Sequence, residues 1–474
     1  MDPSEVASLR SSLASQTFAE ARDKLAGRVA DGSASETDLL NWRLLNADLT
    51  CRSRERPEPA PSRNPIRIAV ASLLFNWPST GGGIIHTAEL AKFLSLSDFE
   101  VCHFYAKHEP WAIGHVEGRL PYASEPLEFS SDAWNAHEIR GRFREAVTRY
   151  APDCVIVTDS WNSKLLLAEA VNEFPYFLRL AAMECLCPLN NVRLLLNSQG
   201  QPQQCRLTQF SDRPACVSCI ETQSNSSGSL HRRERRLAGF ERDDYGERLS
   251  GAFSQARAVL AVNRQVATLV EPYASDVRVI PSGFDEQRFV GLPKRAFGDK
   301  PFRLLFAGLT QEFMKGFHVL LEACRHLWRS RQDFELWVTD SHCQHSDPFL
   351  RCCGWQDQSQ LPHTMAQCDA VVVPTIAQEA LGRTAVEAMG AGRAVIASRL
   401  GGLPETVCEG LTGLLVDPAD GYQLGEAINT LVESPAITAR MGSNGRQRFA
   451  ALFPWDVIIE KHYRPLFEAC RVLR

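Results

Sequence analysis

The sequence lacks any run of about 18 consecutive apolar residues, the length that a membrane-spanning helix needs. Its first stretch, MDPSEVASLRSSLASQ, contains neither the basic segment nor the apolar segment of a secretory signal. The formal net charge is only −5, so the overall charge gives no case for a nucleic-acid partner. We therefore expect a cytoplasmic protein without a transmembrane segment and without a nucleic-acid ligand.

The sequence also lacks the cysteine framework of a small secreted domain, although it contains 15 cysteines. They are scattered along the chain, which is typical of buried thiols in a reducing compartment. One local cluster differs from this pattern and is treated below.

The length of 474 residues exceeds what one simple core accommodates, so we expect two large domains. Residues 1–52 predict a helical extension of two polar, amphipathic helices, in which Ser35 is a plausible N-cap. Residues 53–65 are rich in proline and charge and predict an extended linker.

From residue 66 onward, short apolar runs alternate with helical patterns, as in IRIAVASLLF, CVIVTD and AVLAVN. This alternation indicates a parallel sheet that is covered by helices on both faces. The pattern restarts after Gly283 with FRLLFAG, FELWVTD and AVVVPT. The sequence therefore predicts an α/β fold with two Rossmann-like domains at 66–283 and 284–450, and a C-terminal helix at 451–474 that crosses back to the first domain.

Two loops carry chemistry that suits phosphate. In the turn STGGG, Gly82 and Gly83 let backbone N–H groups approach a diphosphate at the start of a helix, although a tight turn alone also explains the glycines. In the loop AGLTQEFMKG of the second domain, Lys315 can stabilise a departing diphosphate as a point charge, although a lone lysine is more often a solvated side chain.

The segment QEALGRTAVEAMGAG contains two glutamates with seven residues between them. Glu379 lies in a loop after an apolar strand, and Glu387 lies one to two turns into the following helix, where a carboxylate can bind the hydroxyls of a ribose. The amides at the start of that helix form a second anion site; they belong to Ala380, Leu381, Gly382, Arg383 and Thr384. By themselves, these acids also fit a solvated helix end.

These motifs together resemble the retaining glycosyltransferases of family 4, which have the GT-B architecture of two Rossmann-like domains facing a cleft. The resemblance is carried by four motifs in order, from residues 66 to 463: STGGGIIHTAELAKFL, VIPSGFDEQRF, FAGLTQEFMKGFHVLLEA and the region from QEALGR to GLLVDPAD.

The resemblance implies transfer of a sugar from a nucleoside diphosphate donor of the UDP, GDP or dTDP type. In that case Glu387 holds the ribose, and the amides of residues 380–384 hold phosphate. Lys315, Gly82 and Gly83 stabilise the leaving diphosphate, and Glu379 contacts the donor sugar. Because lysine and helix dipoles take the place of a cation, no metal is required for the chemistry. We do not assign Glu379 as a covalent nucleophile.

The sequence departs from the family pattern at two positions. Many relatives have an arginine where this chain has Leu309, so one phosphate-binding cation is missing. Many also have an active-site histidine in a later loop of the first domain; FLRLAAMECLCPLNN contains none, and Arg179 or Glu184 is a possible substitute.

An insert at about 185–236 interrupts the first domain. Four of its cysteines suit the ligands of a tetrahedral zinc ion, namely Cys187, Cys205, Cys216 and Cys219. A loop-rich insert without a core of its own would be stabilised by such an ion. Buried free thiols and a redox pair are the alternatives. The basic run HRRERR at 231–236 is typical of a solvated helix face. The more specific alternative is that it binds an acidic or phosphorylated acceptor.

Three functions fit these observations. The first is a glycosyltransferase that acts on an unidentified acceptor; the second is a non-catalytic, glycosyltransferase-like binding or scaffold subunit. The third is an epimerase or phosphorylase of the same architecture, but the order of the motifs fits a transferase better. The donor base, the donor sugar and the acceptor stay open.

Overall fold

A computed structural model describes residues 17–52, 65–79, 81–197, 199, 202–223, 228–293 and 295–471. The chain forms two compact units, which are described in turn. One contains residues 1–56 and 285–454, and the other contains residues 57–284 and 455–474. We call them the C-terminal unit and the N-terminal unit, after the α/β segment that each contains. The predicted linker at 53–65 lies outside the described residues except for Pro65.

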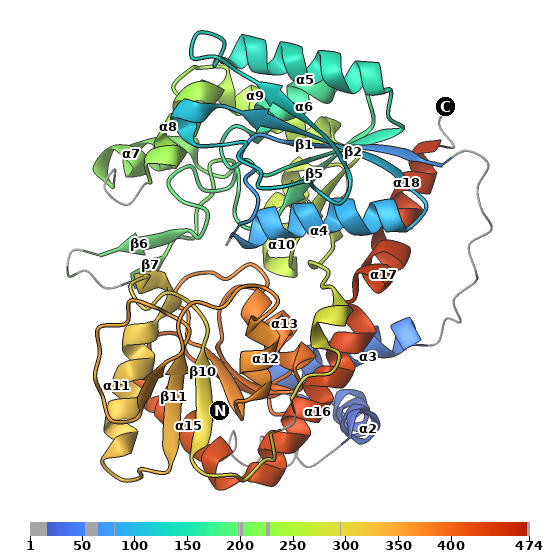
Figure 1. Cartoon of the computed structure of the whole chain (residues 1–474). Helices are drawn as coiled ribbons and strands as arrows, with labels where there is room; N and C mark the ends of the chain where they lie inside the picture. The colour runs from blue at the N-terminus through green and yellow to red at the C-terminus, as the bar shows by residue number, and fades with distance from the viewer. Residues whose placement is uncertain are drawn as a thin grey trace. The chain divides into compact units, whose positions relative to one another are not determined.

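The N-terminal unit is built on a seven-stranded sheet in the order β3-β2-β1-β4-β5-β8-β9, in which all described neighbours are parallel (Figure 1). Its strands are β1 (Arg67–Ser72), β2 (Glu100–Lys107), β3 (Ala123–Glu128), β4 (Cys154–Thr158), β5 (Tyr176–Leu180), β8 (Ala258–Ala261) and β9 (Val277–Val279). The principal helices between them are α4 (Gly82–Leu96), α5 (Ala136–Tyr150), α6 (Lys164–Val171), α9 (Tyr245–Gln255) and α10 (Arg264–Val270).

The insert contributes an antiparallel hairpin and two helices to this unit. Its elements are β6 (Leu194–Leu196), β7 (Pro202–Gln204), α7 (Arg213–Thr222) and α8 (Ser229–Ala238). The hairpin forms a separate two-stranded sheet, so the insert lies outside the main sheet.

The C-terminal unit is built on a six-stranded parallel sheet in the order β12-β11-β10-β13-β14-β15. Its strands are β10 (Phe302–Phe306), β11 (Phe334–Val338), β12 (Leu350–Cys352), β13 (Ala370–Val373), β14 (Ala394–Ser398) and β15 (Gly413–Val416). Its helices after β10 are α11 (Phe317–Trp328), α12 (Leu361–Ala366), α13 (Arg383–Gly390), α14 (Leu403–Thr406), α15 (Gly421–Glu433) and α16 (Pro435–Leu452).

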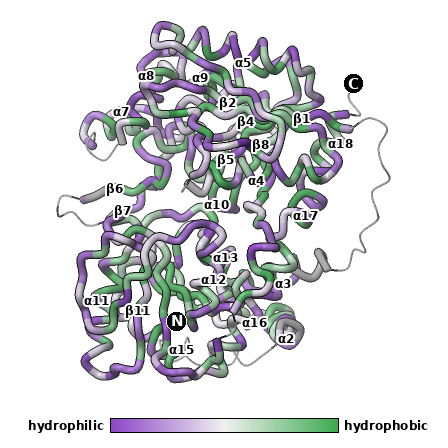
Figure 2. The backbone as a smooth tube through the Cα atoms, in the orientation of Figure 1, coloured by the Kyte–Doolittle hydropathy of each residue, from purple (hydrophilic) through white to green (hydrophobic). Residues whose placement is uncertain are grey.

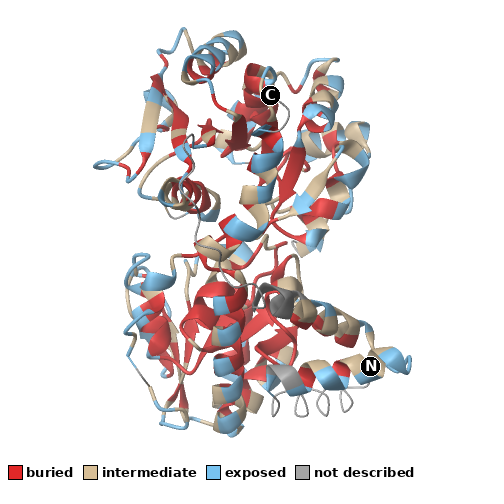
Figure 3. Ribbon diagram, turned by 90° about the vertical axis from the view of Figure 1, so that its right-hand side faces the viewer, coloured by how far each residue is buried: buried red, intermediate tan, exposed pale blue. Residues whose placement is uncertain are grey.

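Both sheets are buried on both faces, as the continuous apolar runs predicted. Every residue of β4, β5 and β14 is buried. Figure 3 shows that buried residues lie in the interior of each unit and exposed residues on the outer faces of the helices. Figure 2 shows hydrophobic segments in the interior of each unit and helices with mixed faces around them. Burial of this apolar surface is the main stabilising contribution to each unit.

The helical extension packs on the C-terminal unit. Its helices are α2 (Phe18–Ala30) and α3 (Glu36–Arg52). Ala21, Leu25 and Leu45 form a small apolar cluster with Cys408 and Leu411, both of which are fully buried. The extension is therefore part of the folded unit rather than a free appendage.

The C-terminal segment packs on the sheet of the N-terminal unit. It comprises α17 (Trp455–Ile458), the π-turn η6 (Ile459–Tyr463) and α18 (Arg464–Arg471). Trp455 and Phe467 are buried in the core of this unit, where Phe467 contacts Phe99 and Phe177. The helix was expected from residue 451, but residues 451–452 end α16, because Pro454 separates the two segments.

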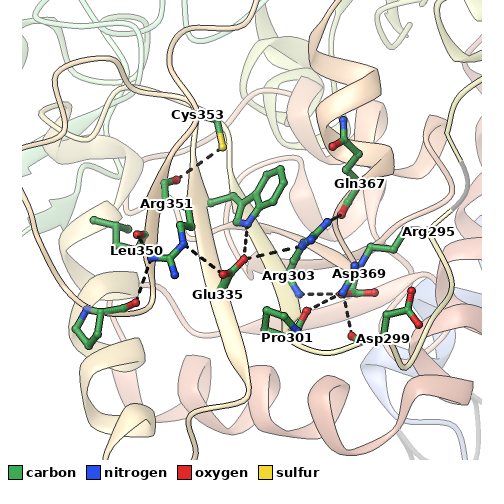
Figure 4. Close-up of polar contacts among 12 residues, drawn as sticks. Arg295, Asp299, Pro301, Arg303, Glu335, Leu350, Arg351, Cys353, Gln367 and Asp369 are labelled. Atoms are coloured by element: carbon green, nitrogen blue, oxygen red, sulfur yellow. Dashed lines mark hydrogen bonds and ion pairs between the residues drawn. The ribbon is translucent and has the colours of Figure 1, made fainter.

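Hydrogen bonds and ion pairs of charged side chains connect the amino ends of neighbouring strands in the C-terminal unit (Figure 4). The Asp369 carboxylate, just before β13, accepts from Arg295 Nε at 3.1 Å and from the Arg303 amide at 2.7 Å. On β11, Glu335 lies beside Arg303 and Arg351. These contacts fix the amino edge, which leaves the carboxyl edge, where ligands bind in open α/β sheets, for the loops described next.

Candidate functional site

The carboxyl edge of the C-terminal unit brings Lys315 and Glu379 together. The sheet order places β10 beside β13, and the connections from these strands leave in opposite directions, which makes this position the switch point at which open α/β sheets bind ligands. Lys315 comes from the loop after β10 and Glu379 from the loop after β13. Lys315 Nζ lies 3.5 Å from Glu379 Oε2. Two residues that are 64 positions apart in the sequence thus form one ion pair at the predicted edge.

Close backbone packing holds the two loops against each other. Thr375 Oγ1 donates to the Met314 carbonyl at 2.9 Å, and the Ile376 amide donates to the same carbonyl at 3.0 Å. Gly316 follows Lys315 with a φ of +71°, and a side chain there would overlap the carbonyl oxygen of Pro374. Glycine is required at this position for both reasons, which explains the sequence Lys-Gly.

The electrostatics of the pair keep Lys315 charged. The neighbouring Glu379 carboxylate is the main cause that raises the pKa of Lys315. Both side chains stay accessible to solvent, with exposed fractions of 40% for Lys315 and 25% for Glu379. A permanently charged, accessible ammonium group at a carboxyl edge is suited to bind an anionic group.

Helix α13 begins at Arg383, shortly after Glu379, with Gly382 as its N-cap. The amides of Arg383 and Thr384 lie in its first turn, where helical N–H groups have no partner within the helix. The Glu379 carbonyl accepts from the Gly402 amide at 2.8 Å, so the loop after β14 supports this turn. The amides of Arg383 and Thr384 thus follow Glu379 closely in sequence and lie at the same carboxyl edge of the sheet as Lys315.

Glu387 has a partner that the sequence analysis did not identify. Its carboxylate is almost fully buried, and Oε1 lies 3.1 Å from Nη2 of Arg288. Arg288 comes from the 3-10 helix η4 (Glu286–Phe289), and its Nε also donates to the Gln358 carbonyl at 2.8 Å. The motif GFDEQRF contained this arginine, but spacing alone gave no sign of the pairing. A ribose hydroxyl at Glu387 would therefore share the carboxylate with a guanidinium.

Leu309 occupies the loop position at which many relatives have an arginine. The following residue, Thr310, donates through its amide and its hydroxyl to Asp340 Oδ2, at 2.8 Å and 2.6 Å. Leu309 itself is 38% exposed. An apolar side chain therefore takes this exposed position, and Lys315 is the cation that pairs with Glu379 at this edge.

In the N-terminal unit, the glycine turn lies where a ligand is expected to bind. Gly81 is the N-cap of α4, which begins at Gly82, directly after the loop that follows β1. A side chain at Gly83 would lie 3.6 Å from Cβ of Ala181 and 3.9 Å from Oδ1 of Asp159. The turn therefore borders the loops after β4 and β5 at the carboxyl edge.

Asp159 is a carboxylate that the sequence analysis did not single out. It follows β4 with a φ of +37°, which is unusual for a residue with a side chain. Burial raises its pKa to about 7, against the opposing effects of hydrogen bonds from Thr87 and Ser72 and the charge of Lys164. A raised pKa at a carboxyl edge is a feature of functional sites.

Neither suggested substitute for the missing histidine is free to act as one. Arg179 is fully buried, and its Nη1 donates to the carbonyls of Leu260 and Ile280 at 3.3 Å and 2.6 Å. Glu184 accepts from the amides of Ala181 and Ala182 at 3.1 Å and 2.6 Å. Arg179 is thus a core residue, and Glu184 shapes the loop after β5.

Helix α8 of the insert contacts the loop after β4 and holds it in place. Glu234 is fully buried, and its carboxylate accepts from the amides of Trp161, Asn162 and Ser163 at 3.0–3.4 Å. The ring of His231 stacks on Trp161 with centroids 4.0 Å apart. The basic run is therefore only partly a solvated face, because one side of the helix anchors the loop that carries Asp159.

The opposite side of α8 is exposed to solvent. The residues of the run that lie there are Arg232, Arg233 and Arg236. The prediction of a solvated basic face thus describes half of this helix.

The four cysteines proposed as zinc ligands, Cys187, Cys205, Cys216 and Cys219, are free thiols in the structure. The pKa of Cys216 is raised to about 12, mainly by burial and to a smaller extent by the neighbouring thiols of Cys187, Cys205 and Cys219. The four sulfurs thus lie within electrostatic range of one another. Among the described residues, however, no three His, Cys, Asp or Glu side chains are close enough to hold a metal ion.

Comparison with known families identifies the C-terminal unit. Residues 292–448 match the family described as "Glycosyl transferases group 1". The second α/β unit is thus similar to the group 1 glycosyltransferases over these residues. The match contains Lys315, Glu379 and Glu387, and it leaves the N-terminal unit outside.

Curated relatives match part of the chain. A glycogen synthase of Mycobacterium tuberculosis is 29% identical over 209 residues, which cover 42% of this chain and 50% of the relative. A D-inositol 3-phosphate glycosyltransferase of Pseudarthrobacter chlorophenolicus is 30% identical over 251 residues, covering 46% of this chain and 59% of the relative. The matched part thus spans about half the length of these relatives.

Solved structures match the fold over both units. A sucrose-phosphate synthase of Thermosynechococcus elongatus is 20% identical with a TM-score of 0.59, covering 85% of this chain and 100% of the other. Anabaena Alr3699/HepE, solved in complex with UDP-glucose, is 16% identical with a TM-score of 0.57 over the same shares. The predicted GT-B fold of two Rossmann-like domains is confirmed.

In the described part of the chain, no helix combines the length and apolar character needed to cross a membrane.

Proposed function

We propose that the chain is a glycosyltransferase that moves a sugar from a nucleoside diphosphate donor to the hydroxyl group of an acceptor. The observation that carries this proposal is the Lys315–Glu379 ion pair at the carboxyl edge of the C-terminal unit. The ammonium group neutralises the charge that develops on the departing diphosphate, and the amides at the start of α13 bind phosphate oxygens.

The other donor contacts follow from the same edge. Glu387 binds the ribose hydroxyls with the oxygen that Arg288 does not hold, and Glu379 orients the donor sugar. Gly82 and Gly83 donate backbone N–H groups to the diphosphate. UDP is the leading choice of nucleotide, because a structure of similar fold was solved with UDP-glucose; GDP and dTDP would use the same acids.

The reaction proceeds with retention of the anomeric configuration and without a metal ion. The acceptor oxygen attacks the anomeric carbon on the face from which the diphosphate leaves, so Glu379 forms no covalent bond to the sugar. Lys315 and the amides at the start of α13 take the place of a divalent metal at the diphosphate.

The test is turnover of nucleotide sugars in the presence of EDTA, with glycogen or water alone as acceptor. UDP-glucose, GDP-mannose and dTDP-glucose are each mixed with the chain, and proton NMR follows nucleotide release and the anomer that appears first. We expect one donor to be consumed, with the α-anomer as the first product from UDP-glucose. Nucleotide binding without turnover of any donor would instead support the non-catalytic binding subunit.

We further propose that Cys187, Cys205, Cys216 and Cys219 bind one structural zinc ion. The proposal is supported by the spacing of the cysteines, by their mutual electrostatic range, and by the amides of Leu189 and Asn190, which hydrogen-bond the Cys187 sulfur. Such hydrogen bonds stabilise the thiolate form that a zinc ligand needs.

Metal analysis tests the zinc proposal directly. The chain is purified from zinc-supplemented medium and its metal content is measured by mass spectrometry, with the Cys216→Ser/Cys219→Ser double variant and a Cys408→Ser control. We expect about one zinc per chain for the wild type and the control, and none for the double variant. A wild type without zinc would contradict the proposal.

A further inference from the structure

The N-terminal unit has its own topological switch point, and the group 1 match does not reach it. The sheet order places β1 beside β4, and the chain leaves these strands toward opposite sides of the sheet. Such a switch point is where open α/β sheets bind ligands. In the C-terminal unit, the equivalent position between β10 and β13 carries Lys315 and Glu379. In the N-terminal unit it carries Gly83, after β1, and Asp159, after β4.

Asp159 differs from the other buried carboxylates of this edge. The oxygens of Glu184 and Glu234 accept backbone amides, so these side chains hold loops in place. Asp159 accepts hydrogen bonds from two side-chain hydroxyl groups: its Oδ2 accepts from Ser72 Oγ at 3.0 Å, and Thr87 also donates to the carboxylate. Its Oδ1 faces Gly83, where the missing side chain leaves room for a ligand atom.

A directed chain of hydrogen bonds supports Asp159 from behind. Burial lowers the pKa of His103 to about 3, so this ring is neutral. Its Nε2 lies 2.8 Å from Ser72 Oγ, and its Nδ1 lies 3.5 Å from the Tyr122 hydroxyl. Because Ser72 donates to Asp159, the His103 Nε2–H donates to Ser72, and Tyr122 donates to Nδ1. All three groups therefore stabilise the charged carboxylate.

The titratable groups around Asp159 come from every neighbouring element. They are His103 on β2, Tyr122 before β3, Lys164 at the start of α6 and Glu184 after β5. The charge of Lys164 favours the carboxylate, and that of Glu184 opposes it. These groups hold the Asp159 carboxylate, which can take up a proton, at the carboxyl edge of the sheet.

We infer that Asp159 binds the attacking hydroxyl of the acceptor and accepts its proton during transfer. This inference rests on the proposed function. A bond forms between the acceptor oxygen and the anomeric carbon, and the bond from that carbon to the diphosphate oxygen breaks. The electron pair leaves with the diphosphate, and the proton moves to the Asp159 carboxylate. The acceptor class is thus a neutral alcohol that is not ionised before it binds.

The pH profile of kcat/KM follows from this role. Asp159 must be ionised to accept a proton, and its pKa is raised to about 7. Activity therefore rises with pH up to about 7 and then reaches a plateau. Ser72→Ala removes a hydrogen bond that favours the charged form, so the rising limb moves to higher pH by about one unit while the plateau is kept.

The experiment measures release of UDP from UDP-glucose by the full chain between pH 5 and pH 9, with glycogen and with water alone. The variants are Asp159→Asn, Ser72→Ala and, as a matched control, Asp132→Asn, whose side chain is exposed in the same unit. We expect Asp159→Asn to lower kcat/KM by at least about 100-fold and to bind UDP as the wild type does. The control should match the wild type in both respects.

The outcomes separate the inference from the proposed function. An active wild type with an unchanged Asp159→Asn variant overturns the inference alone, and so does a Ser72→Ala variant whose rising limb does not move. In the second case the proton goes elsewhere, for example to the departing diphosphate. A wild type that consumes no nucleotide sugar overturns both. If Asp159→Asn does not fold, the Ser72→Ala profile decides the question.

Discussion

At the scale of single residues, the buried pair of Arg288 and Glu387 constrains how a nucleotide can bind. The side chains are 12% and 4% exposed, so each charge depends on the other for its stabilisation. Removing one member of such a pair leaves an uncompensated charge in a poorly solvated place. Substitutions at Glu387 therefore report on stability as well as on ribose binding.

We predict that Glu387→Ala lowers the stability of the C-terminal unit by about 3–5 kcal/mol, because Arg288 then lacks its carboxylate partner. Glu387→Gln keeps an oxygen that accepts from Arg288 and costs less. Differential scanning calorimetry of both variants and of Glu433→Ala, whose carboxylate is largely exposed, measures the difference. Equal unfolding temperatures for the alanine variant and the wild type would contradict the buried pairing.

The sequence predicted some site residues and missed others for a physical reason. Lys315 and Glu379 lie in loops next to strands whose neighbours are fixed by topology, so the motif sufficed to place them on one edge. Asp159 and Arg288 act through burial and through partners that are remote in sequence, namely Ser72 and Glu387. Spacing along one chain carries no information about such contacts.

At the scale of elements, α8 links the insert to the candidate acceptor site. Its Glu234 caps the loop 161–163 with three backbone hydrogen bonds. The sequence showed only a basic run here, since the acid within HRRERR resembles an ordinary solvated charge. The helix therefore positions the segment that follows Asp159, although it comes from the region least like the rest of the domain.

We predict that Glu234→Ala destabilises the N-terminal unit by roughly 1–3 kcal/mol or more, because three amides lose their acceptor. Arg236→Ala, on the exposed side of the same helix, should have little effect. Amide hydrogen exchange of residues 159–163 follows the loop directly. Unchanged protection in Glu234→Ala would show that α8 does not hold this loop.

At the scale of the whole molecule, the alternation of strands and helices sufficed to predict two parallel α/β units. The extension at the amino end and the last helix were harder to place, because their partners are far away in sequence. Asn41 Nδ2 donates to the Glu409 carbonyl at 3.0 Å, and Trp455 lies against Gly283. Each unit is thus completed by a segment from the other end of the chain.

Both units repeat one arrangement: a loop after the first strand meets a loop after the strand beside it, on the other side of the switch point. In the C-terminal unit this arrangement carries a cation and an acid, which suit a nucleoside diphosphate sugar. In the N-terminal unit it carries glycine and a buried acid, which suit a hydroxyl group. The proposed reaction needs these two chemistries.

The most direct test is a calorimetric titration of the full chain with UDP, GDP and dTDP in EDTA. It compares the wild type with Lys315→Ala and with Lys300→Ala, a lysine that pairs with Asp333 at the amino edge of the same sheet. We predict that one nucleotide binds to the wild type and to Lys300→Ala, and that Lys315→Ala binds it at least about tenfold more weakly, since a charged hydrogen bond contributes about 1.5–3 kcal/mol. Equal affinity of all three proteins, or no binding of any nucleotide by the folded wild type, would contradict the assignment of this edge as the donor site.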